Sequence, residues 1–196
     1  ENVIRTSTFF NSSFADENVN VFGRVQRTFG KIRAAVNVNF NYSKINQFIQ
    51  GARSVNESFT QRYVPEIRTN FREAPNVTFR YSYSVTDNDQ GSRSTKFVRN
   101  SPSIDFDAYL WKSVTFKTDY TYTNQDDGNN SISFQTWDAS LAYRKDRDAK
   151  WEYEFEASNI LGTESNIRVN NGNISNSINE TFILPRLITF RLRYTL

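Results

Sequence analysis

The feature that most constrains this chain is a strict two-residue alternation of apolar and polar side chains. The segment Trp151–Ala157 reads Trp-Glu-Tyr-Glu-Phe-Glu-Ala. Successive side chains of a β-strand point to opposite faces, whereas a helix would distribute these residues around its circumference. The segment is therefore expected to be a strand with one mainly aromatic face and one acidic face.

The same alternation recurs along the whole chain and predicts about ten strands, most of them about 10 residues or longer. Strands of globular proteins are usually about 5–6 residues long, so these are unusually long. The clearest predicted strands are 32–42, 77–85, 104–110, 114–122, 137–143, 151–157 and 188–196, and weaker ones are expected at 3–14, 18–28 and 58–71.

The predicted connections alternate between short and long. Short turns are expected at 29–31, 72–76, 111–112 and 145–149, and longer loops at 43–57, 87–94, 124–131 and 160–177. The short link 15–18 is an exception. This alternation is typical of outer-membrane barrels, whose periplasmic turns are short and whose extracellular loops are longer. It predicts the C-terminus at the periplasmic rim and the 160–177 connection on the outside.

Composition agrees with a barrel. The chain has 196 residues, of which 37% are hydrophobic and 15% aromatic, and its mean hydropathy is −0.66. The aromatic content argues against disorder. No apolar run is long enough for a transmembrane helix, but barrel strands are only half apolar. The predicted fold is an all-β, antiparallel transmembrane barrel segment over residues 1–196, in bacterial outer-membrane lipid.

Several function classes are disfavoured by missing residue types. The chain has no Cys and no His, which removes thiol nucleophiles, Ser-His-Asp triads, and thiolate or imidazole metal sites. Its net charge of +3 is too small to indicate a nucleic-acid partner. We therefore expect no enzymatic activity, no cofactor and no resident metal ion.

The two strand faces predict two environments. An Arg or Lys facing lipid at mid-membrane costs about 2–4 kcal/mol, so the charged face should line the lumen. The predicted lumen-facing charges are Asp105, Asp107, Lys117, Asp119, Glu152, Glu154, Glu156, Arg191 and Arg193. The predicted lipid-facing residues are Trp151, Tyr153, Phe155, Phe190, Leu192, Tyr194 and Leu196.

Two acidic groups could be taken for sites. The row of Glu152, Glu154 and Glu156 could perform acid–base chemistry, but pairing with the arginines of the last strand is the favoured interpretation. The segment Asp87–Gly91 is similar to the start of a calcium loop, but it lacks a correctly placed final Glu and is expected to be a turn. The remaining ligand-binding candidates are the predicted loop residues Phe48, Phe59, Asn166 and Asn170.

The C-terminal end carries a family resemblance. The segment Ala157–Leu161 resembles the element that ends the penultimate strand of TonB-dependent receptors. Pro185-Arg186 and the alternating apolar residues up to Leu196 resemble that family's last strand, although the usual final residue is Phe. The Asn-rich composition is also similar to that of TonB-linked outer-membrane barrel proteins.

The resemblance implies that the chain is the C-terminal part of a 22-stranded receptor barrel that takes up a ligand with TonB-supplied energy. The implied partners are outer-membrane lipid, the rest of the barrel, its plug and the TonB system, with a surface lipoprotein as a further candidate. Two alternatives stay open. One is a complete barrel of about ten strands that acts as a pore, adhesin or surface protease. The other is a soluble β-sandwich binding module.

Overall fold

The computed structural model describes residues 16–195 apart from 50–51, 73–74, 92, 112, 147 and 172–175, and it leaves the side chains of 47–49, 168–171 and 176 undescribed. The described residues form eleven β-strands. No helix is present among them, and hence none that could cross a membrane.

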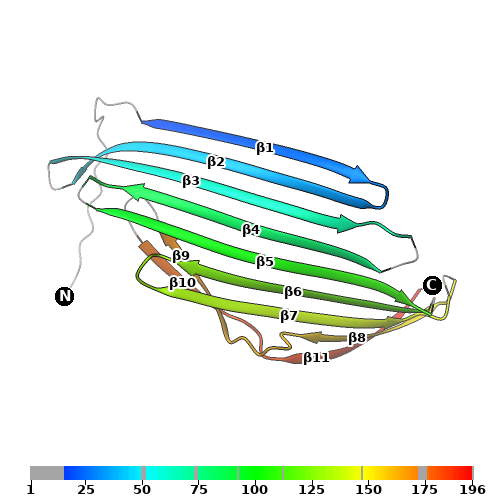
Figure 1. Ribbon diagram of the computed structural model, residues 1–196. Helices are drawn as coiled ribbons and strands as arrows, with labels where there is room; N and C mark the ends of the chain where they lie inside the picture. Colours follow the sequence, from blue (N-terminus) through cyan, green and yellow to red (C-terminus); the bar gives the residue numbers. More distant parts are fainter. Residues whose placement is uncertain are drawn as a thin grey trace, which may run out of the picture.

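Nine strands form one antiparallel sheet in the order β1-β2-β3-β4-β5-β6-β7-β8-β11, so nearly every strand pairs with its neighbour in sequence (Figure 1). Their bounds are β1 Glu17–Phe29, β2 Ile32–Ile49, β3 Ala52–Thr69, β4 Asn76–Asp89, β5 Ser94–Leu110, β6 Val114–Asp126, β7 Ser131–Tyr143, β8 Trp151–Ser158 and β11 Leu187–Tyr194. The two remaining strands, β9 Ser165–Asn171 and β10 Asn176–Phe182, form a separate hairpin inserted between β8 and β11.

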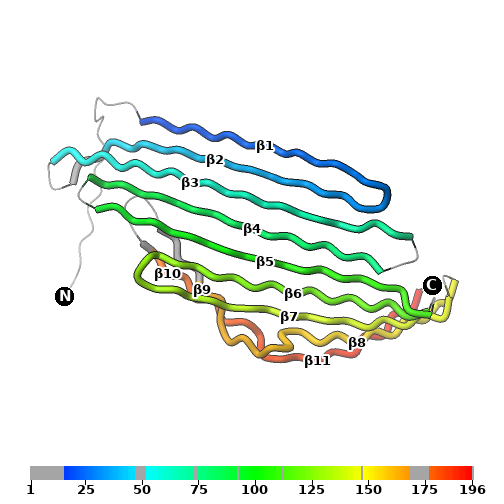
Figure 2. The backbone as a smooth tube through the Cα atoms, viewed as in Figure 1, coloured from blue at the N-terminus to red at the C-terminus, as the bar shows by residue number. Residues whose placement is uncertain are grey.

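The all-β, antiparallel meander predicted from the alternation is confirmed, whereas a closed barrel is not observed. Among the described residues, β1 and β11 each pair on one side only, so the sheet is open and its two edges lie apart (Figure 2). The predicted strand 3–14 lies outside the described residues. The tight turns are confirmed at Gly30, whose φ is 60°, and at Trp111, whose φ is 51°.

The predicted long loop 43–57 is wrong. β2 and β3 continue through it, and their pairing runs without a break from Ile32↔Thr69 to Ile49↔Ala52. The segment lacks a sustained apolar face, which is why its sequence resembles a loop. Backbone pairing does not require such a face, so the ladder extends beyond the alternating segment.

The other predicted loops are also shorter than expected or contain strands. The connections 87–94 and 124–131 contract to residues 90–93 and 127–130, because the flanking strands extend. The connection 160–177 contains β9 and the start of β10. Consequently, the predicted alternation of short and long connections is not observed, and of the predicted long connections only the one between β8 and β11 is long.

The sheet has two chemically different faces, and no second sheet covers the apolar one among the described residues. One face, called here the apolar face, carries most of the exposed large apolar side chains. The opposite face, called the polar face, carries most of the charged and amide side chains of the same strands. Only three apolar residues of the described part are buried, namely Ala35, Val85 and Ala108. The sheet thus has almost no apolar core of its own.

The β6–β7 connection is closed by an aspartate. The Asp127 Oδ1 accepts hydrogen bonds from the backbone N–H groups of Asn130 at 2.6 Å and Asn129 at 2.9 Å. These bonds stabilise the charged form and lower the pKa of Asp127 below its ordinary value of 3.8, the Asn130 N–H having the larger effect. Next to it, Gly128 adopts a φ of 85° and its N–H donates to Asp126.

We expect the order of this connection to depend on acid. Because the folded-state pKa of Asp127 is lowered, its stabilisation is fully present above the pKa of the unfolded chain and is lost as the pH falls through the lowered folded-state pKa. Carboxyl and amide NMR titrations should place this midpoint below 3.8. The Asp127→Asn variant should lack the transition, and a midpoint above 3.8 in the parent protein would contradict the assignment.

Candidate functional site: a bordered apolar band and a charged polar face

The apolar face carries a continuous band of exposed side chains that crosses the nine-stranded sheet. In β8 and β11 the band is aromatic: the ring centroids of Phe155 and Phe190 lie 4.8 Å apart, and those of Trp151 and Tyr194 lie 4.7 Å apart. Phe155 is 54% exposed. A soluble protein rarely leaves so large a contiguous apolar surface uncovered.

The band gives way to a polar border toward the end of the sheet where the connection between β2 and β3 lies. The large apolar residue at the border is Val19, Tyr42, Phe59, Val85, Val98, Tyr122 and Trp137 in β1 to β7 respectively, and beyond the border Val55 of β3 and Phe48 of β2 occupy positions of the same parity. The next residue on the same face is charged or carries an amide in every one of these strands: Glu17, Lys44, Glu57, Asp87, Lys96, Asn124 and Gln135.

This border runs obliquely to the strands. When the directly opposite residues are followed from strand to strand, starting at Trp137 of β7, the residue reached in β1 is Arg27. The border in β1 is at Val19, eight residues beyond Arg27, and six strand-to-strand steps separate β1 from β7. At about 3.3 Å per residue, the border therefore moves about 4.4 Å along the strands at each step to the next strand, and neighbouring strands are about 4.8 Å apart. The line perpendicular to the strands and the border thus enclose an angle of about 40°.

The band also has a membrane-like height. In β2 it extends from Ile32 to Tyr42, a distance of about 33 Å at about 3.3 Å per residue. With a tilt of about 40°, this rise becomes about 25 Å, the height of the lipid-facing band of outer-membrane barrels.

The polar face brings the predicted charged residues of β8 and β11 together. Arg191 contacts Glu154 at 2.8 Å and Glu156 at 3.3 Å, and Arg193 contacts Glu152 at 3.3 Å and Glu154 at 3.5 Å. The preferred interpretation of the glutamate row as a set of cross-strand ion pairs is therefore confirmed. A second network joins Glu66 of β3 to Arg80 at 3.1 Å and to Arg33 at 3.6 Å.

The other predicted polar-face charges lie on β5 and β6. Asp105 is directly opposite Asp119, and Asp107 is directly opposite Lys117. Asp119 is in turn opposite Asp138 of β7, so three carboxylates lie in one row. No group of acidic residues among those described is arranged to hold a metal ion. The calcium-like segment contains the turn that was predicted, in which the Gly91 N–H donates to Asp89 at 2.7 Å.

The four ligand-binding candidates were predicted to lie in loops, but all four lie in strands. Phe48 belongs to β2 and Phe59 to β3, where Phe59 lies on the apolar face opposite Tyr42. Asn166 and Asn170 belong to β9. The structure describes no side chain for Phe48 or Asn170, and it brings none of the four together into a site. Leu196 lies outside the described residues.

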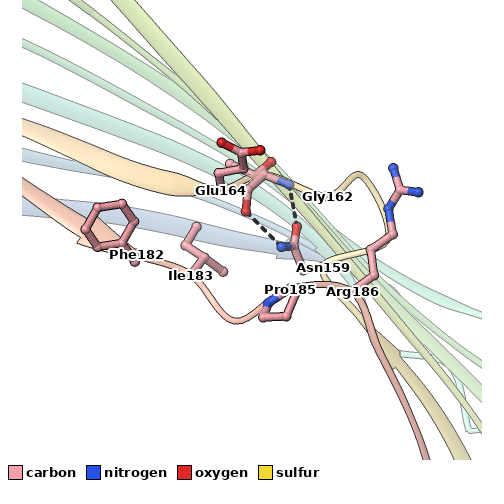
Figure 3. Close-up of a pocket in the computed structure, with 8 residues that line it drawn as sticks. Asn159, Gly162, Glu164, Phe182, Ile183, Pro185 and Arg186 are labelled. Atoms are coloured by element: carbon pink, nitrogen blue, oxygen red, sulfur yellow. Dashed lines mark hydrogen bonds between the residues drawn. The ribbon is translucent and has the colours of Figure 1, made fainter.

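Asn159 organises the point where the chain leaves β8, which the sequence indicated only as part of a family-like motif. Its side-chain amide donates to the Thr163 carbonyl at 2.8 Å and its oxygen accepts the Thr163 N–H, the two hydrogen bonds drawn as dashed lines in Figure 3. The same amide also donates to the Leu184 carbonyl at 2.9 Å. Its own N–H donates to Asp138 at 2.6 Å. Asn159 is buried and has a φ of 51°, a conformation that asparagine tolerates better than most residues.

Arg186 lies close to Asn159 and its hydrogen-bond partners. Its guanidinium donates to the Leu161 carbonyl at 3.1 Å, and a side chain at Gly162 would meet the same group at 2.8 Å. Asn159, Gly162 and Arg186 therefore hold together the two ends of the β8–β11 connection. A shallow depression borders them, but its lining shows no convergent set of catalytic groups.

No family model, curated protein or solved structure matches this chain. The assignment of a function therefore depends on the faces and contacts described above.

Substitution of Asn159 should destabilise the connection between β8 and β11. We expect Asn159→Ala to lower the free energy of unfolding by about 2–4 kcal/mol, because three side-chain hydrogen bonds are lost and two carbonyls lose a donor. Trypsin cleavage within 160–186 should accelerate. Asn20→Ala is a matched control, since that exposed residue bonds only to Asn39 in the contacts resolved. Equal effects of the two substitutions would contradict the role of Asn159.

The ion pairs of the polar face should contribute modestly. A double-mutant cycle between Glu154→Gln and Arg191→Gln should give a coupling energy of about 0.5–1 kcal/mol, because Glu154 is half-buried while Arg191 is exposed. The coupling should fall as salt is added. A coupling that is zero at low salt would show that this pair does not stabilise the sheet.

Proposed function

We propose that this chain forms part of the wall of a bacterial outer-membrane barrel, with its apolar face toward lipid and its polar face toward the lumen. The observation that carries the proposal is the bordered, oblique apolar band. A strand tilt of 35–45° is what closure of a sheet into a barrel requires. The inclination of about 40° was obtained from pairing and side-chain type alone, without assuming closure.

The contents of the two faces support this orientation. Ion pairs at Glu66 and at Glu152–Glu156 gather charges on one face, where a water-filled lumen would solvate them. The same strands place Trp151, Tyr143 and Tyr194 near one end of the apolar face, and aromatic residues are enriched at lipid–water boundaries. The exposed band would then be buried by lipid.

We further propose that the barrel is that of a TonB-dependent-receptor-like transporter, to which this chain contributes the C-terminal strands. The support is the resemblance of 157–161 and 185–196, together with the unpaired edges of β1 and β11 among the described residues. Free edges expose unpaired N–H and C=O groups, which a lipid environment does not tolerate. Further strands of the same barrel would satisfy both edges. The role proposed is uptake of a ligand and not catalysis.

A complete small barrel is less well supported, because β1 and β11 are not paired with each other among the described residues. A soluble sandwich would need a second sheet over the apolar band, and none is present among the described residues. These alternatives differ from the favoured proposal in what touches the apolar face and the sheet edges.

The orientation can be tested with spin labels on neighbouring residues of β8. In the complete natural protein in lipid, a label at Tyr153 should collide with oxygen, which concentrates in the bilayer. A label at Glu154 should collide with a water-soluble nickel chelate. This result follows because adjacent strand residues point to opposite faces. Phe190 and Arg191 provide a matched pair on β11.

Aqueous accessibility at both Tyr153 and Glu154 would overturn the membrane-wall proposal. Protection of both from the chelate and from oxygen would instead indicate a covered sheet, as in a sandwich.

A further inference from the structure

The β9–β10 hairpin does not continue the sheet but folds back across its polar face. Gln125 of β6 lies on that face, two residues after Thr123 in the same strand. Both side chains are almost completely buried, at 2% exposure for Gln125 and 1% for Thr123. The Gln125 side-chain amide donates to the backbone carbonyl of Ile167 in β9 at 2.6 Å. The hairpin is therefore in direct contact with the polar face of β6.

The base of the hairpin is fastened independently of this contact. Asn159 bonds to Thr163 before β9 and to Leu184 after β10, and the Thr163 hydroxyl donates to the Gln135 carbonyl of β7. The hairpin ladder continues to its base, where the Ile183 N–H donates to the Glu164 carbonyl at 2.9 Å. The fastened base directs the hairpin across the sheet and not away from it (Figure 2).

The two attachments involve different groups. The base involves several hydrogen bonds around a buried asparagine, whereas the Gln125–Ile167 hydrogen bond joins β6 to the body of the hairpin. The hairpin also leaves Ile178 and Phe182 strongly exposed, at 69% and 78%, so apolar packing does not hold its outer strand.

We propose that the β9–β10 hairpin is a strap that narrows the passage along the polar face, with the Gln125–Ile167 hydrogen bond as its latch. This inference rests on the proposed function, because the polar face lines a passage only if the sheet is a barrel wall. Solutes that are large relative to the remaining opening pass when the latch is released. Small solutes pass in either state.

The strap can be tested by the reactivity of a thiol placed on the polar face close to Thr123 and Gln125. This chain has no cysteine, so Thr121→Cys adds one thiol to it, on the polar face two residues before Thr123, and any cysteine elsewhere in the complete protein is replaced by serine. The complete natural protein in membrane vesicles is treated with a small methanethiosulfonate or with a maleimide attached to a large polyethylene glycol. The small reagent should react equally fast with the parent and with latch variants.

The large reagent should react about three- to tenfold faster when Gln125→Ala is added, the change expected for loss of one hydrogen bond. Replacement of 165–182 by a short Gly-Ser linker should accelerate it further, and this variant serves if Gln125→Ala does not assemble. Gln26→Ala, the same side-chain change on the far strand β1, should have no effect. Equal rates in the parent, Gln125→Ala and the linker variant would overturn the strap.

A cysteine at Tyr153 separates this outcome from failure of the barrel proposal. If Tyr153→Cys is protected while Thr121→Cys shows no latch dependence, the strap is wrong and the wall proposal stands. If both cysteines react freely with the small reagent, the wall proposal fails, and the strap fails with it.

Discussion

Backbone pairing kept in register across nine strands is the constraint on which the rest of this structure depends. Each strand exposes alternate side chains on opposite faces, so one slip of a single residue would move aromatic side chains among the charges. The observed register avoids this: Phe155 lies opposite Phe190 and Leu141, whereas Glu154 lies opposite Arg191 and Ala142. Segregation of the faces, the oblique border and the ion-pair networks all follow from this pairing.

The near absence of a core explains why the sheet requires an external apolar phase or a covering partner. Burial of apolar surface is the dominant favourable contribution to folding, yet only three apolar residues of the described part are buried. In lipid, the exposed band would be removed from water, and each strand would still satisfy its backbone groups by pairing with neighbours. The polar face then holds charges that would be unfavourable on the lipid side.

Period-two patterning predicted the strands whose faces differ most in polarity, such as 151–157 and 104–110, and it predicted the pairing of Glu154 with Arg191. It failed at 43–57, because a strand with polar residues on both faces has no periodic signal although its backbone ladder continues. The hairpin was missed for a similar reason. The part played by Asn159 could not be read from the sequence, because Thr163 and Leu184 meet it only through the tertiary structure.

The central claim is that the apolar band spans a bilayer, and depth-dependent fluorescence quenching tests it most directly. Single tryptophans would be placed at Ile32, Val36, Asn37 and Tyr42 of β2, in the complete protein with its other tryptophans replaced and in bilayers containing lipids brominated at defined depths. Deep bromines should quench most at Val36, and shallow bromines at Ile32 and Tyr42. Asn37, beside Val36 but on the polar face, should be quenched least. Equal quenching at Val36 and Asn37, or no quenching at either, would contradict the account.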